Sequence, residues 1–141
     1  MEIIEQYHYV SAVTIARIFL GILFLFQGYD AVVKIGMKNV IDAYQKRFAV
    51  KGIPRSLTSI AALFTSYTEL ICGALLIFGL FEFIILYLLG LNLIIAGIGF
   101  GINEPLWDTR HVFPRLVLLL LLLMTPPEWH SFSLDHIFFK S

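Results

Sequence analysis

The sequence predicts an all-α integral membrane protein, built as a four-helix bundle with a short amphipathic helix in one loop. Of the 141 residues, 59% are hydrophobic and only 14% are charged. The mean hydropathy is +0.86, and a soluble domain of this length would carry nearer a quarter of charged residues. The apolar residues also fall into four blocks separated by short polar segments. We therefore expect residues 1–141 to form a single transmembrane domain.

The four expected spans cover residues 10–33, 57–81, 83–102 and 112–125. A hydrocarbon core of ~30 Å requires roughly 20 helical residues, and the first three blocks are long enough. The fourth block contains a shorter apolar run, LVLLLLLLM. It either crosses the membrane with the help of its polar flanks or forms a buried or re-entrant helix. The N-terminus has no basic region before its first apolar stretch, so a cleaved secretory signal is not expected.

Basic residues are distributed unevenly among the loops, and this predicts the orientation. The loop after the first span carries most of them, namely Lys34, Lys38, Lys46, Arg47, Lys51 and Arg55. Arg110 lies in the loop between the third and fourth spans, and Arg115 lies near the start of the fourth. The positive-inside rule then places the first and third loops in the cytoplasm and both termini outside, as in a bacterial inner membrane protein. The basic loop is expected to contact lipid headgroups, and nothing in the pattern indicates nucleic acid.

The first cytoplasmic loop has a helical pattern of its own. Val40, Ile41, Tyr44 and Phe48 recur among charged residues at roughly helical spacing. This spacing predicts a short amphipathic helix on the membrane surface. The alternative is an ordered connector that only sets the distance between the spans. Asp30, near the end of the first span, and Lys34, at the start of this loop, are four residues apart and are expected to pair on the helix surface.

Arg17 lies inside the first span, where an arginine costs roughly 2.5–3.5 kcal/mol on insertion scales. Glu69, in the second span, is an acidic residue at a compatible depth. Consecutive spans are usually neighbours, so the sequence predicts an ion pair between Arg17 and Glu69. This pair would either clamp the two helices together or line a ligand or proton site, since ionisable groups inside a bilayer are candidate functional residues.

Small residues accompany the two charged residues on the same helix faces. Gly21 and Gly28 share a stripe with Arg17 in the first span, and Gly73 shares one with Glu69 in the second. Gly79 follows at the end of the second span. Small residues let membrane helices approach closely. These four glycines are therefore predicted to be helix-packing residues.

Aromatic and basic residues gather where the fourth span begins. Trp107, His111 and Arg115 could form a rim at the cytoplasmic face that holds a quinone headgroup. A plain interfacial belt of aromatic and basic side chains is the alternative. The four histidines show no paired ligand spacing, so no metal site is predicted. Cys72 is the single cysteine, and a disulfide relay within one chain needs two.

Several of these residues occur in an order that resembles the DoxX family. The matching positions are Arg17, Gly21, Gly28 and Lys34 in the first span, Gly52, Ile53 and Pro54 before the second, Glu69, Gly73 and Gly79 in the second, and Ser133, Leu134 and Asp135 after the fourth. The resemblance implies a membrane four-helix bundle. The family takes its name from a subunit of a thiosulfate:quinone oxidoreductase, and other relatives belong to membrane redox complexes or act as assembly factors.

Two functions are consistent with these features. In the first, the protein is a membrane subunit of a quinone-linked redox complex, with Arg17 and Glu69 at the headgroup. It would then need a membrane or extracytoplasmic protein partner to supply electrons, because the sequence shows no electron carrier of its own. In the second, it is a non-catalytic accessory, assembly or scaffold subunit that packs against other membrane proteins. The sequence does not decide whether the protein is an enzyme.

Overall fold

The computed structural model describes residues 2–103, 110 and 112–139, and this part of the chain is helical without a strand. The elements are α1 (Glu2–Tyr29), the π-helical segment η1 (Asp30–Gly36), α2 (Met37–Ala49), α3 (Arg55–Phe78), α4 (Glu82–Asn103), α5 (Phe113–Met124), the 3₁₀ turn η3 (Pro127–His130) and α6 (Leu134–Phe139). Three stretches are long and apolar enough to cross a membrane, at Tyr7–Ala49, Arg55–Phe78 and Glu82–Asn103. The prediction of an all-α membrane bundle with a short helix in the first loop is confirmed.

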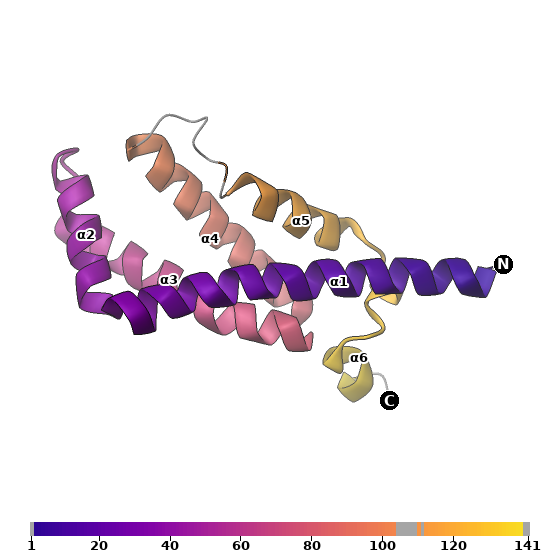
Figure 1. Ribbon diagram of the computed structural model, residues 1–141. Helices are drawn as coiled ribbons and strands as arrows, with labels where there is room; N and C mark the ends of the chain where they lie inside the picture. Colours follow the sequence, from indigo (N-terminus) through magenta and orange to yellow (C-terminus); the bar gives the residue numbers. More distant parts are fainter. Residues whose placement is uncertain (1, 104–109, 111, 140–141) are drawn as a thin grey trace.

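Helices α1, α3, α4 and α5 form the bundle, and α1 runs along its whole length (Figure 1). The largest helix–helix interface joins α1 to α3. Helix α2 turns away from the axis of α1 and crosses one end of the bundle, which we call the α2 end. The start of α1, η3 and α6 all lie at the opposite end, which we call the Arg17 end (Figure 1).

Glycine and proline set the ends of several elements. Gly36 has a φ of +84° and separates η1 from α2, and Pro54 precedes the first residue of α3. Gly79 ends α3 with a φ of +68°. Its N–H donates to Leu76 O and that of Leu80 to Leu75 O, both at 3.1 Å, which is the Schellman pattern of a glycine-terminated helix. The chain thereby reverses tightly between α3 and α4.

Helices α1 and α3 approach each other closely at glycines. A Cβ on Gly21 would lie 2.9 Å from Gly73 O. One on Gly28 would collide with the backbone N of Leu70, and one on Gly73 with the backbone N of Leu25. Side chains at these three positions would push the two helices apart, so the absence of a Cβ is what permits this spacing.

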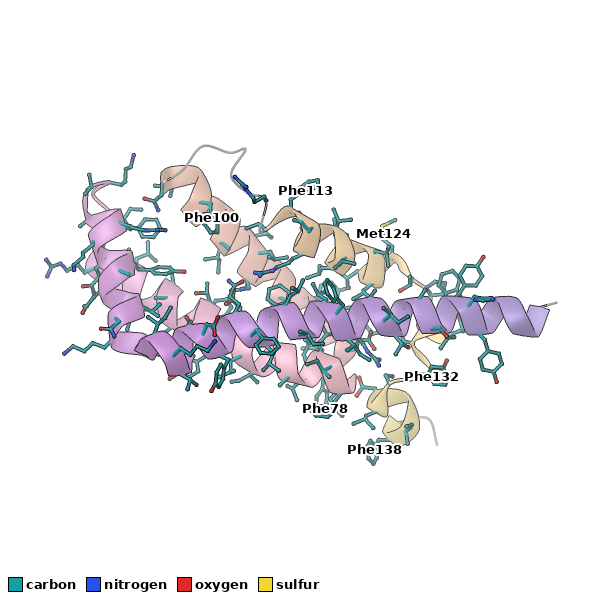
Figure 2. The ribbon with its side chains drawn as sticks, viewed as in Figure 1. Phe78, Phe100, Phe113, Met124, Phe132 and Phe138 are labelled. Carbon is teal, nitrogen blue, oxygen red and sulfur yellow. The ribbon has the colours of Figure 1, made fainter. Side chains whose placement is uncertain are left out.

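Apolar side chains fill the centre of the bundle and also cover its outside. The buried core consists of Val13, Leu20, Phe24, Cys72, Leu76, Ile85, Leu86, Leu89, Leu93, Leu119 and Leu122. Phe113 and Met124, at the two ends of α5, point away from the bundle (Figure 2) and are largely exposed. An apolar exterior of this kind suits a hydrocarbon solvent, in which the helices satisfy their own backbone hydrogen bonds. The chain is thus an integral membrane protein with lipid-facing helices.

The fourth apolar block forms a short helix. Helix α5 has 12 residues, or about 18 Å at 1.5 Å per residue, which is less than the ~30 Å hydrocarbon core. Thr125 then leaves the helix with an extended backbone, and η3 follows. The described part of this block therefore does not cross the core as a single helix, and its C-terminal end leads directly to the Arg17 end of the bundle.

Candidate functional site

Arg17 is buried at one end of the bundle, where it pairs with Glu82. Arg17 is 2% exposed and Glu82 is 3% exposed. Nη1 of Arg17 donates to Oε2 of Glu82 at 3.1 Å, and Nη2 donates to the carbonyl oxygen of Phe132 at 2.7 Å. Nε of Arg17 is buried without a hydrogen-bond partner. The ion pair therefore joins α1 to the first residue of α4 and to the segment after α5.

His130 extends this pair into a network that we call the Arg17 cluster, which consists of Arg17, Glu82, Thr125, His130 and Asp135. Nδ1 of His130 lies 2.5 Å from Oε1 of Glu82, and Nε2 lies 2.7 Å from Oγ1 of Thr125. Oδ2 of Asp135 accepts the backbone N–H of Glu82 at 2.9 Å and thus caps the start of α4. Both carboxylate oxygens of Glu82 are engaged, which is how a buried charge is usually tolerated.

The predicted ion pair between Arg17 and Glu69 is wrong, because Arg17 pairs with Glu82 instead. Glu69 is hydrogen-bonded to Gln27, which lies ten residues beyond Arg17 on α1. That separation is about 15 Å along a helix, too far for an arginine side chain. Glu82 lies between the expected spans 57–81 and 83–102, so the span boundaries place it outside the membrane interior.

Gly79 lies beside the Arg17 cluster and not in a helix interface. It was predicted to be a helix-packing residue, but it ends α3 in the left-handed conformation. A Cβ there would meet Nη1 of Arg17 at 2.6 Å and Cβ of Ser133 at 2.7 Å. Gly79 also accepts the backbone N–H of Asp135 at 3.1 Å. The glycine therefore gives room for the guanidinium group and anchors the C-terminal segment.

A second polar network surrounds the buried side chains of Glu69 and Asn92, and we call it the Glu69 cluster. Oε1 of Glu69 accepts a hydrogen bond from the side-chain amide of Gln27 at 2.9 Å and one from that of Asn92 at 3.0 Å. Nη1 of Arg115 donates to Oε1 of Gln27, and the Arg115 guanidinium lies 5.5 Å from the ring centre of Phe24. Four helices thus contribute to one cluster, and Oδ1 of Asn92 is left buried without a partner.

The Glu69 cluster opens into a groove of about 530 Å³, which we call the Glu69 groove. Its apolar wall consists of Ile22, Leu23, Phe26, Ala31, Ile35 and Val40. Its polar lining consists of Gln27, Asp30, Tyr44, Thr65, Ser66, Glu69 and Arg115. Phe26 and Ile35 are also more than half exposed on the outer surface. The groove therefore connects the lipid-facing surface with the buried carboxyl group of Glu69.

An apolar layer separates the two clusters. On α1, Leu20 and Phe24 lie between Arg17 and Gln27, and both are fully buried. On α3, Leu76 lies between Glu69 and the turn that leads to Glu82. On α4, three buried residues lie between Glu82 and Asn92, namely Ile85, Leu86 and Leu89. The Arg17 cluster and the Glu69 cluster are therefore distinct sites at different depths of the bundle.

Of the three residues predicted to form a headgroup rim, Trp107 and His111 lie outside the described residues. Arg115 is in α5 and contributes to the Glu69 cluster. An aromatic pair is found instead at the Arg17 end, where the rings of Tyr9 and Trp129 stack with their centres 4.4 Å apart. Such amphipathic rings are typical of the membrane–water interface.

Sequence reasoning missed four residues that complete the two clusters. Gln27 and Asn92 donate hydrogen bonds to Glu69, whereas Glu82 and His130 belong to the Arg17 cluster. The available signal was polarity inside apolar blocks, since a buried polar side chain needs a partner. The signal does not identify that partner, which in the case of His130 comes from a distant part of the chain.

Comparison with known proteins gives one match. The family model described as DoxX matches residues 12–101, a range that runs from α1 into α4 and includes Arg17, Glu69, Glu82 and Asn92. Neither the curated proteins nor the solved structures yield a match. The matched range contains the α1–α3 interface and most of the Glu69 groove, while Arg115 and His130 lie beyond it.

Proposed function

The chain belongs to the DoxX family, and we propose that it is a quinone-binding membrane subunit that works with an external redox partner. The observation that carries the proposal is the Glu69 groove. It brings an apolar wall and several hydrogen-bonding side chains together at the lipid-facing surface. Ligand sites commonly combine an apolar lining with a few placed polar groups.

The chemistry of the groove fits a quinone headgroup. A quinone ring is flat and largely apolar, and its carbonyl oxygens accept hydrogen bonds. The groove offers donors in the guanidinium of Arg115 and the amide of Gln27. The volume of about 530 Å³ falls in the usual range for small-molecule sites. Because Phe26 and Ile35 lie on the outer surface, an isoprenoid tail could continue from the groove into the lipid.

Each side chain of the cluster has a separate task in this proposal. A bound quinone would supply the redox couple, taking up electrons together with protons. Arg115 and Gln27 would orient its oxygens by donating hydrogen bonds. Oε1 of Glu69 already accepts two amide hydrogens, so Oε2 is the oxygen that would hold a proton. The apolar layer around Leu20 and Phe24 would exclude water from the Arg17 end.

The orientation proposed from the basic residues assigns the two ends of the bundle to opposite sides of the membrane. The α2 end carries the lysine-rich loop and would face the cytoplasm of a bacterial inner membrane. The Arg17 end would face the extracytoplasmic side, where a protein partner could approach. The ion-paired Arg17 cluster would hold the C-terminal segment in place there and is assigned a structural role.

The proposal predicts that the Glu69 cluster controls quinone affinity. Glu69→Gln and Arg115→Gln are each expected to weaken binding of decylubiquinone by about 10- to 100-fold, since a hydrogen bond to a charged group contributes about 1.5–3 kcal/mol. Lys38→Gln removes an exposed cation at the α2 end that does not line the groove, and it should leave the affinity unchanged. Calorimetric titration of the detergent-solubilised protein measures these affinities.

Native mass spectrometry of protein purified from its own membranes provides the second test. A retained mass that matches a quinone and is lost in the Glu69→Gln variant supports the proposal. Stoichiometric protein partners without a quinone, together with no decylubiquinone binding by calorimetry, would overturn it. The alternative function, an accessory or assembly subunit, would then take its place.

A further inference from the structure

Two carboxyl groups line the same groove, one buried and one about half exposed. Glu69 is buried in α3, whereas the side chain of Asp30, in η1, is 48% exposed. We propose that Asp30 relays protons between Glu69 and the water at the α2 end, through the groove that both residues line. This inference deepens the proposed function and rests on it for its biological purpose, but its physical basis is independent of any quinone.

The local structure places polar side chains along the route. Gln27, which contacts Glu69, and Asp30 are three residues apart, so they lie on one face of the helix about one turn from each other. Thr65 and Ser66 lie one turn before Glu69 on α3 and line the groove. Tyr44 of α2 also lines the groove. A series of hydrogen-bonding groups therefore leads from the buried carboxyl to the α2 end.

The groove is wide and polar enough for water. A water molecule occupies about 30 Å³ of liquid and needs two to four polar partners in a buried site. The volume of about 530 Å³ exceeds this requirement, and the hydroxyl, amide and carboxyl groups of the lining supply partners. Water that bridges polar groups is therefore compatible with this part of the groove, and hydrogen-bonded water can pass a proton between the two carboxyls.

The opposite direction lacks such groups. From Glu69 towards the Arg17 end, the bundle interior contains the apolar layer around Leu20, Phe24 and Leu76, all fully buried. The next carboxylate, Glu82, is engaged by Arg17 and His130. Among the described residues, the polar lining thus leaves Glu69 only towards the α2 end. The proton route from Glu69 therefore runs towards the α2 end and not towards the Arg17 end.

The proton transfer has a simple balance. A proton on Glu69 passes by way of water to the carboxylate of Asp30, which leaves Glu69 ionised and Asp30 neutral. Asp30 then releases the proton to water at the α2 end and becomes a carboxylate again. Nζ of Lys34 lies 2.6 Å from Oδ1 of Asp30, which confirms the expected pair, and this cation stabilises the carboxylate. The other ionisable groups that line the groove are Arg115 and Tyr44.

Hydrogen–deuterium exchange of the Glu69 carboxyl tests the route without a quinone. The protein in lipid vesicles is transferred to deuterated buffer, and infrared spectroscopy follows the carboxyl band that Glu69→Gln removes. Asp30→Asn is expected to slow the exchange by about 100-fold, as is typical for the loss of a positioned proton-transfer group. Asp30→Glu should restore most of the rate. Asp42→Asn removes an exposed carboxylate in α2 that does not line the groove and should have no effect.

The outcomes separate this inference from the proposed function. The relay would be overturned if the Glu69 carboxyl exchanged as fast in Asp30→Asn as in the wild type. It would also be overturned if Asp42→Asn slowed the exchange as much as Asp30→Asn does. Circular dichroism of each variant verifies that its helices are formed, and Asp30→Glu guards against a merely structural effect. Decylubiquinone affinity is measured on the same preparations. Slow exchange with normal affinity in Asp30→Asn supports the relay. Absent binding in the wild type would reject the quinone proposal but would not affect the exchange result.

Discussion

Glu82→Gln is expected to destabilise the protein by about 3–5 kcal/mol, the largest effect of a single polar substitution in this chain. Glu82 is the shared partner of Arg17 and His130, and all three residues are at most 5% exposed. Removal of one member of a buried ion pair leaves the other charge uncompensated in a medium of low dielectric constant. Unfolding in mixed micelles with increasing dodecyl sulfate measures the change in free energy.

Two comparisons make this result specific. Glu128→Gln changes an exposed carboxylate near the same end of the bundle and should shift stability by less than about 0.5 kcal/mol. The double variant Arg17→Met, Glu82→Gln should lose less free energy of unfolding than the two single variants lose together, because neither charge is then left without its partner. A loss for Glu69→Gln larger than that for Glu82→Gln would contradict the assignment of Glu82 as the partner of Arg17.

Gly28→Ala is expected to cost about 2–3 kcal/mol and to weaken quinone binding as well. The added Cβ would lie 2.6 Å from Leu70 Cα and 2.8 Å from the carbonyl carbon of Glu69. Both atoms belong to the backbone and cannot rotate away, so α1 and α3 must separate, as in other overpacked sites. The separation would lengthen the hydrogen bond between Gln27 and Glu69. Mixed-micelle unfolding and calorimetric titration with decylubiquinone measure the two effects.

Gly97→Ala is the matched control for this substitution. Gly97 lies in α4, and a Cβ there would meet no atom within 4 Å. Alanine in a helix interior is more favourable than glycine by roughly 0.5–1 kcal/mol, so this variant should be at least as stable as the wild type. If Gly28→Ala were as stable as Gly97→Ala, the close approach of α1 and α3 would not depend on the missing side chain.

The helices and their glycine contacts could be predicted because both depend on local sequence. Apolar blocks of sufficient length become helices, since the backbone has no other way to satisfy its hydrogen bonds within lipid. Gly21, Gly28 and Gly73 could be recognised as close-approach positions from their spacing on a helix face. The short α2 helix followed from its apolar periodicity, and the brevity of α5 was already visible in its nine-residue apolar run.

The partners of the buried polar groups could not be predicted in the same way. The Arg17 cluster depends on a tight turn at Gly79, which brings Glu82 into the bundle. It also depends on the C-terminal segment, which places His130 next to Glu82 although the two residues are 48 positions apart in the sequence. Likewise, Arg115 reaches Gln27 across 88 residues. Hydropathy does not identify the acid that meets Arg17, and only the packing of the helices selects Glu82.

The sequence by itself therefore determined the membrane class, the helical elements and the glycine-lined face of α1. These properties follow from hydropathy and from the helical repeat, which act within a few turns of chain. The tertiary structure alone decided that Arg17 and Glu69 belong to two different clusters with an apolar layer between them. The reason is geometric: an ion pair forms only between groups within a few ångströms, and such distances arise only when the helices have been placed side by side.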